Sequence, residues 1–373
     1  MSPRYLPLIL ALALLPPLAA CDRQPDGPPP PSAEAKAAIR DDGGAPSVPL
    51  GRAIDALFDE EAVGRTQALL VMKRGTVVVE RYAPETGAKT SLPGWSMAQC
   101  ITSLMIGQLV SDGRLRMDET APVPDWQRPG DPRGEITLRQ LLQMRSGLRH
   151  EENAQSESKS DRMRMLFLDG RDDMAAYAEA QPLEAPAGRL FEPSSATGVI
   201  LADLASRVLT DSRDPDLRHR AVADYLRTRV LDPVGMKSTR VTFDRAGTLV
   251  GSSMMLAPAR DWAQLGEFLR HNGSVKGAQV LPHRWVTFMR TASPRNPAYG
   301  AGVWLNGTPP EGVAPLWPGQ PRKDLFACRG EHGQYVVGSP GQLLTVVRLG
   351  HSAPEQYGAL HDRMGVLLDL FPG

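Results

Sequence analysis

The sequence predicts an α+β domain in which one antiparallel sheet is built from both ends of the chain. β-rich runs lie near the start of the folded region and again in its last quarter, and helical patterns fill the long stretch between them. A sheet of this kind needs helices on its faces to bury its apolar side chains. We therefore expect helices flanking the sheet and a helical subdomain inserted between its first and last strands.

The chain begins with a targeting signal. Arg4 precedes an apolar run over residues 6–18, which is shorter than a membrane span and typical of a signal-peptide core. The run ends in Leu18-Ala19-Ala20-Cys21, which resembles the lipobox of bacterial lipoproteins, where the cysteine is lipidated. We predict a signal peptide over residues 1–20 and a lipid anchor on Cys21. The alternative is an ordinary signal peptide followed by a chance cysteine.

A proline-rich segment follows the cysteine. It contains four consecutive prolines, Pro28 to Pro31, and later Gly43-Gly44. Such a composition buries little apolar surface, so we predict a tether over residues 21–50 and a folded domain over residues 51–373.

Charge and size restrict the class of protein. The chain has 42 basic and 42 acidic residues, so it offers no electrostatic case for nucleic acid as a partner. Its 373 residues are 42% hydrophobic, which is enough for a sizeable core.

The expected sheet starts with a hairpin. Residues 52–60 have helical character, and the β-rich runs 67–72 and 76–82 are joined by Lys73-Arg74-Gly75, a hairpin signal.

The segment Gly94-Trp95-Ser96-Met97-Ala98-Gln99-Cys100 opens a long helix. Apolar residues at helical spacing follow the serine until Asp112-Gly113. They are Ile101, Leu104, Met105 and Leu109.

The remaining predicted elements form a long helical middle followed by C-terminal strands. We predict a proline-rich loop over 121–132 and an exposed charged loop over 150–164. Helices are predicted over 136–142, 174–180, 198–209, 221–230, 261–271 and 282–290, strands over 300–306, 325–328, 334–337 and 343–349, and a last helix over 357–370.

Several short motifs occur in a characteristic order. They include Trp95-Ser96-Met97-Ala98, Ile136-Thr137-Leu138-Arg139, Ser146-Gly147-Leu148, Gly235-Met236, Gly251-Ser252-Ser253, Ala259-Arg260-Asp261-Trp262-Ala263, Gly333-Gln334 and Val347-Arg348-Leu349-Gly350. In this order, over residues 50–372, the chain resembles the β-lactamase-related serine hydrolases. The nearest branch contains 6-aminohexanoate-dimer hydrolases and class C-like esterases. The resemblance implies a β-lactamase/transpeptidase-like fold and acyl transfer on esters or amides, without a cofactor or a metal.

The resemblance also identifies a nucleophile whose base is missing. The family has Ser-x-x-Lys, in which the lysine takes the proton of the serine. Here Ser96 is followed by Gln99, and an amide is no base near neutral pH. The tyrosine that shares the proton shuttle in the family corresponds to Pro193, which has no titratable group.

The third family motif corresponds to Gly330-Glu331-His332-Gly333-Gln334. The resemblance places an oxyanion hole at the backbone N–H groups of Ser96 and Gln334. Glu331 stands in the place of a cationic residue and would repel carboxylate-bearing substrates. His332 is the candidate substitute base, although an ordinary strand histidine is an equal alternative. Glu192 is a weaker candidate.

The cysteines leave two alternatives open. Cys100 and Cys328 remain after Cys21. The family fold places the serine helix against the strand of the last motif, so in an oxidising periplasm the two could pair, and two buried free thiols are an equal alternative.

The sequence leaves three functions open. The first is a periplasm-facing lipoprotein of the inner membrane whose serine hydrolase domain is weakened or altered in activity. The second is a pseudoenzyme, a catalytically inactive family member that binds a peptide, a cell-wall fragment or a partner protein in the cleft, or acts as a scaffold. The expected ligand of the domain is a small-molecule or peptide-like ester or amide. The third is a structural lipoprotein, for which the sequence has no positive sign. Gly94-x-Ser96-x-Ala98 also approaches the nucleophile elbow of α/β-hydrolases, but no strand precedes it and no βα units surround it.

Overall fold

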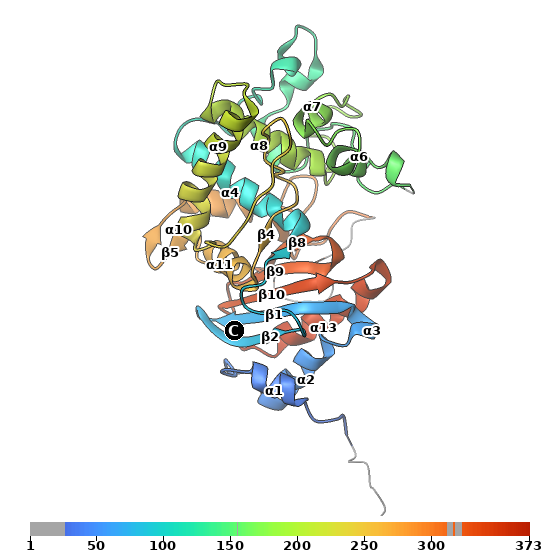
Figure 1. Cartoon of the computed structure of the whole chain (residues 1–373), viewed down its shortest axis with the longest axis vertical. Helices are drawn as coiled ribbons and strands as arrows, with labels where there is room; N and C mark the ends of the chain where they lie inside the picture. The colour runs from blue at the N-terminus through green and yellow to red at the C-terminus, as the bar shows by residue number, and fades with distance from the viewer. Residues whose placement is uncertain (1–26, 155, 312–315, 318–322) are drawn as a thin grey trace, which may run out of the picture. The chain divides into compact units, whose positions relative to one another are not determined.

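The central sheet of the domain joins the two ends of the chain, as predicted. It is antiparallel throughout, with the strand order β2-β1-β10-β9-β8-β7. In Figure 1 the blue strands β1 and β2 lie beside the orange-red strands β9 and β10. The strands are β1 (Arg65–Lys73), β2 (Thr76–Tyr82), β7 (Trp304–Leu305), β8 (Phe326–Gly330), β9 (Gln334–Ser339) and β10 (Leu344–His351).

The computed structural model describes residues 27–154, 156–311, 316–317 and 323–373. The chain divides into a unit ending at Pro30 and a unit over Pro31–Gly373, and the fold described here is that of the second unit. The predicted signal peptide and the predicted lipidation site, Cys21, lie outside the described residues. No helix in the described part of the chain is both long and apolar enough to cross a membrane.

Alternation along the strands gives the sheet two buried faces. Leu70 and Val347 belong to a core that includes the helical subdomain, whereas Val71 and Val346 belong to a second core on the opposite face. Because successive side chains of a strand point to opposite faces, a β-strand with apolar residues at every position requires cover on both sides. Helix α11 (Ala259–Arg270) covers the first face, and α13 (Tyr357–Asp369) packs with α2 (Ser47–Ala56) in the second core.

The helical subdomain lies between β2 and β7 in the chain. Its centre is the contact between α4 (Ala98–Ser111) and α8 (Ser195–Leu209), both of which are buried over most of their length. Figure 1 shows α8 between α9 and the green helices α6 and α7, and α8 packs on both α4 and α9. The other helices are α5 (Leu138–Leu142), α6 (Asp161–Phe167), α7 (Met174–Glu179), α9 (Pro215–Leu226), α10 (Asp232–Val234) and α12 (His283–Met289).

The predicted tether over residues 21–50 is too long, because the structure begins to pack at Pro31. Ser32 caps α1 (Ala33–Ala38), whose Ala35 is fully buried, and Leu50 is fully buried in α2. The hydroxyl of Ser32 also donates a hydrogen bond to Asp55. The proline-rich composition suggested an unfolded segment, because it contains few apolar side chains. Those few are buried in the core on one face of the sheet. The expected helix over 52–60 is accordingly displaced to α2 and α3 (Glu60–Val63).

The predicted exposed loop over 150–164 is also corrected. His150 and Asp161 are buried, and α6 begins at Asp161. A charged sequence predicts a solvated surface. In this segment, however, charged side chains pair with one another, as His150 does with Glu152, and with distant residues, as Arg162 does with Glu331. The predicted helix over 221–230 starts earlier, at Pro215, and its last part is a π-helix over Arg227–Leu231.

Candidate active site

Ser96 sits in a tight turn at the start of α4. The turn is a 3₁₀ helix, Trp95–Met97, and Trp95 adopts a left-handed backbone with φ of 49°. This conformation is uncommon for a bulky residue and is found where surrounding structure enforces it. The neighbouring Gly94 is enclosed, because a Cβ there would lie 2.2 Å from the Trp262 ring. The backbone around the serine is therefore held in one position.

A cleft of about 460 Å³ opens in front of Ser96. Gln99 and Pro193, which the resemblance assigns to the lysine and tyrosine positions of the family, line the same cleft, so the structure brings these three predicted site residues together. The other lining residues are Met144, Glu152, Asn153, Ser194, Tyr299, Trp304, Arg329, Gly330, Glu331, Gly333, Tyr335 and Tyr357. Neither Gln99 nor Pro193 offers a base.

Glu331 makes the polar contacts with Ser96. The Ser96 hydroxyl lies 2.9 Å from Oε1 and 2.9 Å from Oε2 of the carboxylate. The Ser96 N–H donates to Oε2 at 3.2 Å. The carboxylate thus occupies both the hydroxyl and the N–H that the resemblance assigns to the oxyanion hole.

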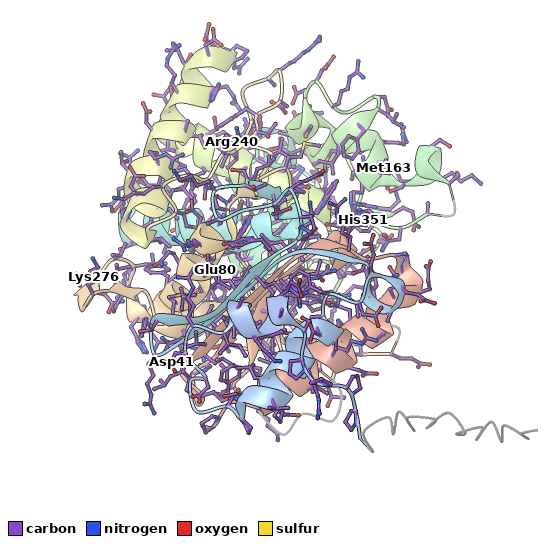
Figure 2. All side chains as sticks on the ribbon, turned by 60° about the horizontal axis from the view of Figure 1, so that its bottom comes forward. Asp41, Glu80, Met163, Arg240, Lys276 and His351 are labelled. Carbon is purple, nitrogen blue, oxygen red and sulfur yellow. A yellow bond between two sulfur atoms is a disulfide. The ribbon has the colours of Figure 1, made fainter. Side chains whose placement is uncertain are left out.

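His332 is directed elsewhere. Its ring stacks on His351 at 4.2 Å between ring centroids and lies edge-on to Trp95 at 5.4 Å; His351 is labelled in Figure 2 at the end of β10. His332 is not among the residues that line the cleft. Burial, together with the neighbouring His351, lowers its pKa. The structure gives His332 no hydrogen bond to Ser96, and its role as a base stays a prediction.

Gln334 closes the turn that carries Glu331. It pairs with Gly330 across β8 and β9, and its buried side chain donates to the carbonyl oxygens of Glu331 and His332 at 3.0 and 3.3 Å. These bonds fix the shape of the turn. The proposed oxyanion function of the Gln334 N–H stays a prediction.

A second carboxylate, that of Glu152, also lines the cleft. It accepts hydrogen bonds from the N–H and the hydroxyl of Ser195, at 2.9 and 2.6 Å, and lies 2.7 Å from His150. Burial alone would raise the pKa of Glu152, but the hydrogen bonds of His150 and Ser195 outweigh it and lower the pKa. A carboxylate at the first turn of α8 is also favoured by the helix dipole.

Arg162 bridges the two carboxylates of the cleft. Its guanidinium lies 3.5 Å from Glu331 Oε1 and 3.7 Å from Glu152 Oε1. The side chains of all three are less than one-third exposed. Arg162 therefore offsets the like charges that would otherwise repel each other across the cleft.

Glu192, the weaker candidate base, lines an adjoining cleft rather than the one in front of Ser96. Burial and the neighbouring carboxylate of Glu184 raise its pKa to about 7. That value suits a general base, but the structure does not bring Glu192 to the serine.

A disulfide joins the two elements that meet at the site. Cys100 on α4 and Cys328 on β8 are bonded and fully buried, with their Cα atoms 6.1 Å apart. The sequence left open whether the two cysteines form a disulfide or remain buried free thiols, and in the structure they form a disulfide.

The sequence did not single out Glu152, Arg162, Arg329 or the three tyrosines of the cleft. No local signal marks them, because Glu152 and Arg162 lie in a charged stretch that looks like solvated surface. Their common position becomes visible only when α6 and α8 are packed together in the helical subdomain, beside the turn that carries Glu331.

Comparison with known proteins agrees with this architecture. Similar solved structures include a Bacillus anthracis protein assigned as a 6-aminohexanoate-dimer hydrolase (TM-score 0.65, 19% identity, 86% of this chain and 83% of that chain). They also include a family VIII carboxylesterase (TM-score 0.59, 13% identity, 85% and 96%) and a β-lactamase from Mycobacterium bovis (TM-score 0.58, 16% identity, 86% and 100%). At these identities the likeness shows the fold. None of the curated proteins matches the chain in sequence.

The family model described as beta-lactamase matches residues 54–368, which is nearly the whole folded domain. The match includes the serine turn, the cleft and the sheet described above. The chain therefore belongs to the β-lactamase family of serine hydrolases.

Proposed function

We propose that the domain transfers the acyl group of an ester or amide to Ser96, with activity that is weak or altered relative to its family. The single observation that carries this is the position of Ser96, whose hydroxyl faces a cleft and is hydrogen-bonded to a carboxylate. Gln99 in place of the family's lysine and Pro193 in place of its tyrosine support reduced turnover, since loss of a general base lowers the rate by a factor on the order of 10²–10⁴. Its ligand is a small-molecule or peptide-like ester or amide.

The alternative function is a pseudoenzyme that binds such a ligand, or a partner protein, in the same cleft. Its support is the contact between Glu331 and the Ser96 N–H, which fills the place of a substrate carbonyl oxygen.

A fluorophosphonate probe separates these two functions. An acyl-transfer enzyme forms a covalent adduct at Ser96 that mass spectrometry locates and that Ser96→Ala abolishes. Absence of labelling in the native chain, with labelling gained in Gln99→Lys combined with Pro193→Tyr, would instead favour the pseudoenzyme. Ser111→Ala, which alters an exposed serine at the other end of α4, is the matched control and should keep the Ser96 adduct.

We also propose that the protein is lipid-anchored at Cys21 and faces the periplasm from the inner membrane. The lipobox-like sequence supports the anchor, and the Cys100–Cys328 disulfide supports an oxidising compartment. Metabolic labelling with an alkyne fatty acid should mark the native protein and not Cys21→Ser. Recovery of unlabelled native protein in the soluble periplasmic fraction would overturn the anchor.

A further inference from the structure

Within the described part of the chain, Glu331 is the titratable residue that hydrogen-bonds Ser96. We propose that Glu331 is the base of the serine, replacing the lysine and tyrosine of the family. The inference rests on the proposed function and deepens it, because it names the group that moves the proton.

The other titratable side chains of the cleft are committed to different partners. Glu152 accepts from Ser195 and is paired with His150. The Tyr299 hydroxyl accepts from the Gly302 N–H, and burial raises its pKa far above neutrality. The two remaining tyrosines also have partners, as Tyr335 bonds His361 and Tyr357 accepts from the His332 N–H. Arg329 is a cation and no base at neutral pH.

The turn that carries Glu331 is held against the serine from several sides. A Cβ on Gly330 would lie 2.2 Å from the carbonyl oxygen of Gly94, so the two backbones are in close contact beside Ser96. The disulfide ties β8 to α4 within a few residues of both groups. The buried Arg348 donates to the carbonyl oxygens of His332 and Gly333 at 3.1 and 3.0 Å. A catalytic pair held this way needs little reorganisation to react.

The two oxygens of the carboxylate have different surroundings. Oε1 lies near Arg162 at 3.5 Å, whereas Oε2 accepts from the Ser96 N–H at 3.2 Å. A substrate carbonyl can therefore displace Oε2 from the N–H while Oε1 keeps the Ser96 hydroxyl. Arg162 is a positioning residue in this step, because it holds the oxygen about which the carboxylate turns.

The proton balance of the reaction is then complete. In acylation the Ser96 oxygen attacks the carbonyl carbon, its proton passes to Glu331, and the carbonyl electron pair moves to the oxygen at the Ser96 N–H. Collapse breaks the bond to the leaving group, which departs with the proton of Glu331 as an alcohol. A water then gives a proton to Glu331 and attacks the acyl carbon, and Ser96 leaves with that proton.

The chemistry of a carboxylate base restricts the substrate. A carboxylate is a weaker base than a neutral amine, so it suits esters with good leaving groups better than amides. The negative charge also disfavours a carboxylate next to the reacting carbonyl. We infer that the substrates are uncharged or cationic esters.

The experiment uses the full-length protein, purified in detergent, with 4-nitrophenyl butyrate as the ester and a fluorophosphonate as the probe. The kcat/KM is measured against pH for the native protein and for Glu331→Gln, Glu331→Asp, His332→Gln and Arg162→Gln. Glutamine keeps the shape of Glu331 and removes its basicity, so folding should be retained and is checked by melting temperature. Glu135→Gln, an exposed glutamate outside the cleft, is the matched neutralisation control.

For Glu331→Gln, kcat/KM should fall by about 10²–10⁴, and its decrease toward acid pH should disappear. Glu331→Asp should recover part of the rate and the acid dependence. His332→Gln should keep the acid dependence, and Arg162→Gln should move it because the positioning charge is lost.

Two results would overturn the proposal while leaving the proposed function intact. One is labelling of Ser96 in Glu331→Gln at or above the native rate. That result would mean that the carboxylate hinders the reaction of Ser96 and is not its base. The other is an acid dependence lost in His332→Gln and kept in Glu331→Gln. A native protein that neither turns over the ester nor labels at Ser96 would overturn both.

Discussion

The carboxylate of Glu331 engages both hydrogen-bond donors of Ser96, the hydroxyl and the N–H. At the place where the family resemblance expects a positive charge, the cleft therefore carries a negative one. This carboxylate is the acceptor that we propose for the serine proton, and Arg162 lies 3.5 Å from it. The residue beside it, His332, stacks on His351 and takes no part in the contact.

A different histidine sets a pH dependence of folding. Burial, together with the nearby Arg329, lowers the pKa of His361 to about 4, so the folded protein keeps it neutral. The unfolded chain binds the proton near pH 6.5. Folding stability from this group is therefore full above pH 6.5 and is lost as the pH falls toward 4, by on the order of 2 kcal/mol.

Urea unfolding at pH 7 and pH 4.5 checks this expectation. In His361→Gln, which can still bond Tyr335, the difference in unfolding free energy between the two pH values should shrink. The exposed His283→Gln serves as the control. An unchanged difference in His361→Gln would contradict the prediction.

At the scale of elements, the contact between β8 and the serine turn decides the geometry of the cleft. Gly330→Ala would push its Cβ to within 2.2 Å of the Gly94 carbonyl oxygen, so one of the two backbones must move. We expect fluorophosphonate labelling of Ser96 to fall by more than about tenfold, since a displacement of about 1 Å costs on the order of 10² in rate.

Gly358→Ala is the matched control for this substitution. Gly358 lies on α13, and a Cβ there meets no neighbour within 4 Å. Alanine should stabilise the helix by about 0.5–1 kcal/mol and leave labelling unchanged. Equal labelling in both variants would show that the close approach at Gly330 is irrelevant to the site.

The disulfide is the second connection between these elements. Cys100 and Cys328 are separated by 228 residues, so cross-linking them restricts the unfolded chain strongly. Cys100→Ala combined with Cys328→Ala should lower the free energy of unfolding by about 3–5 kcal/mol. The measurement is the urea midpoint with and without a reductant. If reduction leaves the native midpoint unchanged, the bond contributes no stability.

At the scale of the whole molecule, the N-terminal helices belong to the domain. Ala35 and Leu50 are fully buried in the core beneath the sheet, and Ser32 is bonded to Asp55 of α2. A chain beginning at Pro31, which contains the whole second unit, is the reference for urea unfolding. A chain beginning at Gly51 should lose about 3–5 kcal/mol, because a buried leucine alone contributes roughly 1.5–3 kcal/mol. Equal midpoints for the two shortened chains would mean that residues 31–50 are a tether after all.

The sequence by itself determined the sheet, most helices and the position of the serine. The spacing of apolar residues, with a period of two in strands and about 3.6 in helices, is a local property of the sequence. The hairpin of β1 and β2 and the helix after Ser96 can therefore be predicted without the fold. The family resemblance also named Gln99 and Pro193, and the structure places both in the cleft with Ser96. The prediction from sequence failed at residues 31–50 and 150–164, where composition suggested solvated chain and a few buried side chains decided otherwise.

Only the tertiary structure decided which groups meet in the cleft. Ser96 and Glu331 are separated by 235 residues, and Glu331 and Arg162 by 169. No periodicity joins residues so far apart; their distances follow from how the serine turn packs on β8 of the sheet and how α6 packs in the helical subdomain. The same packing turned His332 onto His351, brought Cys100 to Cys328 and placed the carboxylate of Glu331 on the serine. The sequence thus identified the serine, whereas its hydrogen-bond partner, Glu331, was identified only by the tertiary structure.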